Sequence, residues 1–73
     1  MNAEQIIAML KTGMHTVTFR KGDGSIRTMV GYAPEVTFQR TGNVVPVVDM
    51  DTGLWKSFRA DSLISIEPFN PYL

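Results

Sequence analysis

The spacing of the apolar residues changes at Gly13, and this change constrains the fold more than any other feature of the chain. Before Gly13 the apolar residues recur at helical spacing, whereas from residue 14 to residue 67 they alternate with polar residues in short runs. A period of two indicates strands with one buried face. The sequence therefore predicts one short helix followed by a β-sheet.

The helix is expected at residues 2–12. Asn2 can cap it, because its side-chain oxygen can accept a hydrogen bond from the amide of Glu4 or Gln5. Gly13 follows the last turn as the C-cap. The apolar positions on one helical face are Ala3, Ile6, Ile7 and Leu10. A helix of about ten residues does not persist alone in water, so this face must pack on another element.

The β-rich part of the chain divides into short runs separated by turn residues. The expected strands lie at residues 14–20, 25–32, 44–50, 54–59 and 63–67. Glycine-containing turns at 21–24 and 51–53 join the first pair and the second pair, which predicts two hairpins. Pro46 cannot donate to a β-ladder and therefore suggests an edge strand or a bulge.

One helix and five short strands in a chain of 73 residues favour a mainly β fold, a small and strongly bent barrel. Closing the sheet would remove its exposed edges and enclose a core. The passage through residues 60–62 between the last two strands is typical of SH3-like barrels, and a helix on the open end is typical of the Sm-like form. We expect one domain over residues 1–73, with the helix at 2–12, the barrel at 14–67 and an irregular tail at 68–73.

Composition excludes several classes of protein. Seven Lys and Arg residues balance seven Asp and Glu residues, so the strong basic field of a DNA-coating protein is absent. The chain has no cysteine, and therefore no disulfide framework and no thiolate metal site. Its first residues lack the basic flank of a signal peptide and its apolar runs are too short to span a bilayer. A cytoplasmic location with no membrane partner is expected.

Two segments resemble a known family. Residues 17–29 resemble the first hairpin of a family of small tailed-phage proteins, and residues 45–66 resemble that family's second block, with a Trp, a Phe-Arg pair and an Asp-Ser at fixed spacing. The family is described as an Sm-like SH3 β-barrel, and the resemblance covers residues 15–67. It implies this fold and a phage origin, which would place the protein in the host cytoplasm, and it implies no particular activity.

The residues do not form a recognisable catalytic or metal-binding set. His15, the single histidine, is expected in solvent at a strand edge. Asp49 and Asp51 bracket a tight turn, where carboxylates accept local backbone amides, and Asp61 is expected to cap the turn before the last strand. The glycines at residues 22–24 are expected to form a turn, because no helix follows to make a phosphate site. The sequence predicts a protein that is not an enzyme, with no metal and no cofactor.

Basic and aromatic residues together indicate a binding surface. The candidate binding residues, for protein or nucleic acid, are Trp55, Arg59, Lys56, Arg20 and Arg27. Trp55 and Arg59 alternate with the core residues Leu54 and Phe58 and would face away from them. Whether Trp55 instead completes the core of a strongly bent sheet stays open at this point.

Two functional classes fit these observations, and we expect a protein partner before a nucleic acid. In the first, the protein is a non-catalytic phage accessory module that binds a host or phage protein and modulates its activity. Trp and Arg dominate protein-interface hot spots. In the alternative, it is a barrel that binds single-stranded nucleic acid by base stacking and phosphate contacts. Assembly into a homo-oligomer through exposed strand edges is a third possibility.

Overall fold

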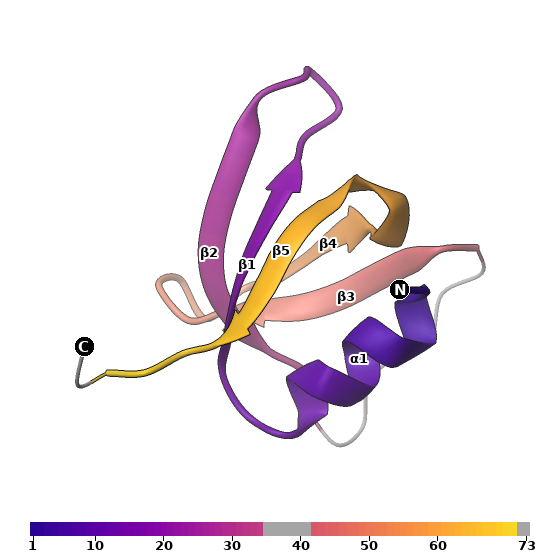
Figure 1. Ribbon diagram of the computed structural model, residues 1–73. Helices are drawn as coiled ribbons and strands as arrows, with labels where there is room; N and C mark the ends of the chain where they lie inside the picture. The colour runs from indigo at the N-terminus through magenta and orange to yellow at the C-terminus, as the bar shows by residue number, and fades with distance from the viewer. Residues whose placement is uncertain (35–41, 72–73) are drawn as a thin grey trace.

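A helix and five strands make up the described parts of the chain, residues 1–34 and 42–71 of the computed structural model (Figure 1). In chain order they are α1 (Ala3–Lys11), β1 (His15–Arg20), β2 (Ile26–Tyr32), β3 (Val44–Asp49), β4 (Trp55–Arg59), the 3-10 turn η1 (Ala60–Ser62) and β5 (Leu63–Pro68). Each element lies within two residues of its predicted bounds. Most of the connection between β2 and β3, and the end of the predicted tail, lie outside the described residues.

Local hydrogen bonds fix both ends of α1. The Asn2 side chain accepts a hydrogen bond from the Gln5 amide, and the Gln5 side chain accepts one from the Asn2 amide, which is a reciprocal capping box. The C-cap residue is Thr12, so the prediction of Gly13 as the C-cap is wrong by one residue, and Gly13 follows with a φ of +152°. The predicted cap at Asn2 is confirmed. The apolar face is buried as predicted, against β3 and β2.

The strands form one antiparallel sheet in the order β4-β3-β2-β1-β5. The predicted fold class is therefore confirmed, but the expected closure is absent, since β4 and β5 are the two edges and do not pair in the part of the chain that the structure describes. The three residues of η1 turn the chain from β4 towards β1, and β5 pairs with β1 instead of closing on β4. The result is a strongly bent, open sheet with α1 beside β3 (Figure 1).

Pro46 lies in β3, which is an inner strand of the sheet, so the expectation of an edge strand is wrong. Among the described residues, the ladder between β2 and β3 consists of the pairs Gly31–Asp49 and Tyr32–Val48. Pro46 lies beyond the last of these pairs and faces Ser57 of β4 on its other side. Proline is tolerated in this inner strand because the pairing of β2 with β3 has ended before Pro46, so no carbonyl of β2 needs the N–H that proline lacks.

One core joins the helix to the concave face of the sheet. Its buried members are Ala3, Ile6, Ile7, Leu10, Val17, Phe19, Met29, Ala33, Val45, Val47, Phe58 and Ala60. His15 is buried as well, and the expectation of a solvent-exposed histidine is wrong. It lies in phase with Val17 and Phe19 on the inner face of β1. Its Nδ1 is 3.0 Å from the carbonyl oxygen of Gly13, which accepts the ring N–H.

At Gly31 of β2, strand β3 approaches closely, and this position provides a test of the packing. A Cβ at Gly31 would meet Val47 Cγ2 at 2.6 Å and the carbonyl oxygen of Val48 at 2.9 Å. We predict that Gly31→Ala lowers the free energy of unfolding by about 1–3 kcal/mol, the usual cost of overpacking. The matched control is Gly22→Ala, whose Cβ would meet nothing within 4 Å. Equal urea midpoints for the two variants would contradict the close approach.

Candidate functional site

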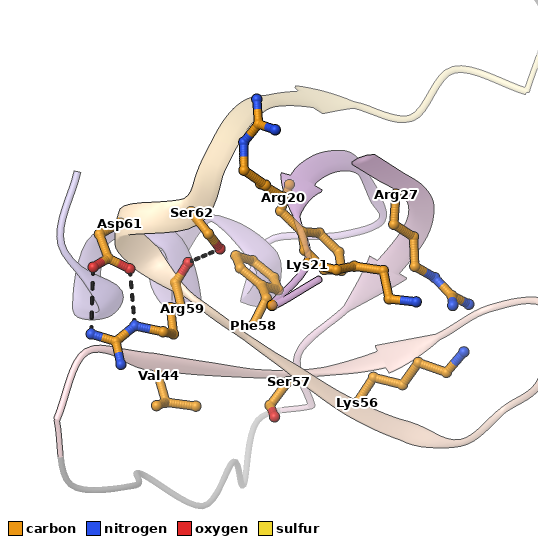
Figure 2. Close-up of a pocket in the computed structure, with 12 residues that line it drawn as sticks. Arg20, Lys21, Arg27, Val44, Lys56, Ser57, Phe58, Arg59, Asp61 and Ser62 are labelled. Carbon is orange, nitrogen blue, oxygen red and sulfur yellow. Dashed lines mark hydrogen bonds and ion pairs between the residues drawn. The ribbon is translucent and has the colours of Figure 1, made fainter. Parts of the chain in front are cut away.

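An open groove lies between the end of the β1–β2 hairpin and strand β4, on the side where the sheet does not close. Its volume is about 860 Å³. The lining residues are Phe19, Arg20, Lys21, Gly22, Arg27, Val44, Lys56, Ser57, Phe58, Arg59, Asp61 and Ser62. Figure 2 shows Lys21 and Arg27 on the hairpin side of the space, with Arg27 extending towards Lys56 of β4, whereas the Arg20 side chain points away from β4.

The floor of the groove is apolar. The rings of Phe19 and Phe58 stack with their centroids 4.9 Å apart and an interplanar angle of 14°. These side chains join β1 to β4 across the bent sheet, and only 7% and 5% of their surfaces are exposed. Val44 extends the apolar surface. The ring faces are already occupied by each other and by the core, so the floor offers apolar contact and no exposed aromatic ring on which a base could stack.

The walls of the groove are cationic. The basic residues that line it, within the described ranges, are Arg20, Lys21, Arg27, Lys56 and Arg59. They come from the end of β1, the adjoining turn, β2 and β4, so only the bending of the sheet brings them together. Arg20 is held in place by a 2.9 Å hydrogen bond from its Nη1 to the carbonyl oxygen of Gly24, across the hairpin turn.

Asp49 is a buried carboxylate behind this wall. Lys56 Nζ lies 2.9 Å from its Oδ2 and Arg27 Nη2 lies 3.6 Å from the same oxygen, while 2% of the Asp49 side chain is exposed. The Asp51 amide donates a 2.9 Å hydrogen bond to Oδ1. The hydrogen bond from Lys56 and that from the Asp51 amide hold the pKa of Asp49 below its ordinary value of 3.8. Asp49 thereby fixes the direction of two cationic side chains from β2 and β4.

The remaining acidic residues do not neutralise the groove. Asp61 lies opposite Arg59, with the Arg59 Nε 3.2 Å from its Oδ1, and both side chains are exposed. Five cations line the groove, and the carboxylates close to them are those of Asp49, Asp61 and Asp23, the last of which interacts electrostatically with Lys21. The groove therefore keeps an excess of two positive charges. Asp23, in the hairpin turn, accepts hydrogen bonds from the Oγ and the amide of Ser25, which lower its pKa. A protein of zero formal net charge thus carries a local basic groove.

Four of the five predicted binding residues line this groove: Arg20, Arg27, Lys56 and Arg59. Trp55 does not line the groove, and because 49% of its surface is exposed it is not a core residue either. The expectation that Leu54 lies in the core with Phe58 is wrong, since Leu54 is exposed. Lys21, which flanks the same turn as Arg20, lines the groove as well. Sequence reasoning missed Phe19 as a lining residue and Asp49 as the ion-pair partner, since no local pattern joins Asp49 to Arg27.

No described feature supports a metal or catalytic site. Within residues 1–34 and 42–71 no group of three His, Cys, Asp or Glu side chains could hold a metal ion. Asp49 does accept a turn amide, as predicted. The prediction that Asp61 caps the turn is wrong, since Arg59 is the N-cap residue of η1 and accepts a 2.7 Å hydrogen bond at its carbonyl from Ser62 Oγ. Asp61 instead pairs with the Arg59 side chain, and both side chains face solvent.

The chain combines a strongly bent, open five-stranded sheet with an N-terminal helix and a groove at the open side of the sheet. The family model WYL_2, with the description Sm-like SH3 beta-barrel fold, matches residues 3–64. The chain belongs to this family, and the resemblance noted in its sequence is confirmed. That description names no reaction.

A relative comes from Enterobacteria phage T4 and is described as "Uncharacterized 11.5 kDa protein in Gp31-cd intergenic region". It is 36% identical over 70 residues, a match that covers 78% of this chain and 69% of the relative. No solved structure matches the chain. Within the described ranges, no helix is long enough and apolar enough to cross a membrane.

The buried ion pairs of Asp49 predict a pH-dependent stability. Because its pKa is lowered on folding, ionised Asp49 stabilises the fold above pH 3.8, and this contribution is lost as the pH falls below 3.8 through the folded-state pKa. We predict that Asp49→Asn lowers the free energy of unfolding at neutral pH. The difference from wild type should shrink below pH 3.8 in urea titrations at a series of pH values.

Asp61→Asn is the control for this measurement, because its pair with Arg59 is solvent-exposed and such pairs contribute little. Its effect at neutral pH should be smaller than that of Asp49→Asn. If the Asp49→Asn difference stayed constant from neutral pH to below 3.8, the ion pairs would not be the source of the stabilisation.

Proposed function

We propose that this protein is a non-catalytic binding module that engages a partner protein by taking an acidic segment of it into the groove. The observation that carries the proposal is the cationic wall above an apolar floor, in a chain with no net charge. A peptide that combines carboxylate and aliphatic side chains is complementary to both surfaces at once. Charge complementarity of this kind contributes to partner choice and to the association rate.

The floor favours a protein segment over a nucleic acid strand. Single-stranded nucleic acid binding relies on exposed aromatic rings along a basic groove. Here Phe19 and Phe58 are buried against each other, and Trp55 lies outside the groove. Apolar contact without a stacking platform suits aliphatic side chains. Single-stranded nucleic acid remains the second candidate because five cations could also contact phosphates.

The comparisons support an accessory role in a phage. The family description contains a fold and no reaction, and the T4 relative is a small phage protein. A small barrel without a described catalytic set can act by occupying a surface of another protein. We therefore propose that the partner is a host or phage protein and that binding modulates the activity of this partner.

A charge-reversal pair tests the groove. The probe is a fluorescein-labelled peptide of alternating glutamate and valine, and binding is followed by fluorescence anisotropy. Lys21→Glu changes an exposed cation of the groove and should weaken binding about tenfold, or about 1.4 kcal/mol. Lys11→Glu changes an exposed lysine in the last turn of α1, which does not line the groove, and should leave the affinity unchanged.

Equal affinities for the two variants would remove the groove as the binding site. A labelled oligothymidylate is titrated in parallel at about 50 mM salt, where phosphate contacts are strong. Tighter binding of the oligonucleotide than of the peptide, with a steep salt dependence, would replace the protein segment with the second candidate.

A further inference from the structure

Strand β4 is an edge of the sheet, and the hydrogen bonds of its inner side define what its outer side exposes. The Asp49 amide donates to the carbonyl of Leu54 at 3.0 Å, and the Ala60 amide donates to the carbonyl of Asn43 at 2.8 Å. In an antiparallel ladder, bonded and non-bonded pairs alternate. The even-numbered residues of β4 therefore bond to β3, and the odd-numbered ones direct their amides and carbonyls away from it.

The outward groups are those of Trp55, Ser57 and Arg59. The carbonyl of Arg59 is already occupied by the hydroxyl of Ser62 at 2.7 Å. The amides of all three residues and the carbonyls of Trp55 and Ser57 have no strand partner among the described residues, because β4 is the last strand of the sheet. These groups form the outer edge of β4, about 13 Å long at the usual rise per residue of a strand.

In the part of the chain that the structure describes, the outer edge of β4 lacks the usual devices that protect an edge strand. Lysine side chains, prolines or a covering loop commonly block pairing. Here Lys56 turns inward to Asp49, and Arg59 is held by Asp61. Pro46 lies in β3 and does not affect the outer edge. The edge runs along the groove, because Ser57 and Arg59 line it (Figure 2).

We propose that the acidic segment of the partner protein binds as an added strand on the outer edge of β4. This inference rests on the proposed function and specifies its mode of binding. The excess of positive charge in the groove argues for an acidic occupant. In an added strand, alternate side chains point to opposite faces. One set then lies beside Lys56 and Phe58, and the other lies beside Ser57 and Arg59. All four of these β4 residues line the groove.

Backbone methylation of the probe tests strand addition without changing the protein. The probe is an end-blocked peptide of about seven alternating glutamate and valine residues. Two isomers carry N-methyl groups either on every glutamate or on every valine. A strand directs these two sets of amides to opposite sides, so one isomer should lose at least about tenfold in affinity and the other should bind like the parent peptide.

Trp55 provides the signal for these titrations, because it is the single tryptophan of the chain, is half exposed and begins β4. Its emission should shift to the blue when a strand covers the outer edge. Equal binding of the parent peptide and both isomers would overturn strand addition while leaving the acidic groove intact. Failure of the parent peptide to bind would overturn the proposed function and this mode together, so the two failures are distinguishable.

Ser57→Pro removes the one amide at the centre of the outer edge. Proline is tolerated where the N–H faces solvent, and β4 directs this N–H away from β3. Ser57→Ala is the matched control, since it shortens the side chain and keeps the amide. Ser57→Pro should lose at least about tenfold in affinity and Ser57→Ala less than about twofold. If Ser57→Pro does not fold by its urea midpoint, the methylated peptides decide the question.

Other occupants of the outer edge give different results. Sedimentation velocity across a concentration series would reveal a second copy on the edge as a dimer or larger assembly that Ser57→Pro disrupts. That outcome would overturn the partner strand. A monomeric protein that binds the parent peptide, with loss confined to one methylated isomer and to Ser57→Pro, supports it.

Discussion

The carboxylate of Asp49 is the interaction on which both the hairpin and the groove depend. Its oxygens accept a turn amide and face two cations that come from different strands. A charge that is 2% exposed is costly unless it is paired and hydrogen-bonded, and here each oxygen has a partner. If one of these partners were lost, a buried charge would remain without full compensation, which is strongly destabilising. The ion pairs therefore couple the end of β3 to the direction of the side chains that form the cationic wall.

The local elements could be predicted because their causes are local. The cap at Asn2, the buried face of α1 and the two turns each depend on residues within a few positions of one another. His15 shows that residue type alone is a poor guide to burial. It was expected in solvent as a polar residue at a strand edge, yet its phase with Val17 was visible in the alternation and places it inside.

The groove was only partly predictable. The basic residues could be selected from the sequence because they flank the turns and share β4, but their distances depend on how far the sheet bends. The ion pair between Arg27 and Asp49 joins residues from β2 and the end of β3, and no spacing rule connects them. The prediction that the sheet closes was wrong for a similar reason. The pairing of β5 with β1 depends on the direction in which η1 turns the chain, and the sequence does not show this direction.

The short ladder between β2 and β3 divides the sheet into two parts. One part contains β1, β2 and β5, and the other contains β3 and β4 with α1 against them. Two residue pairs, together with the core and the ion pairs of Asp49, join these parts. The groove is the space between them, so its width is set by the angle at this seam. The residues of this short β2–β3 ladder, above all Gly31, thus influence which peptide segments fit into the groove, although they do not contact the bound segment themselves.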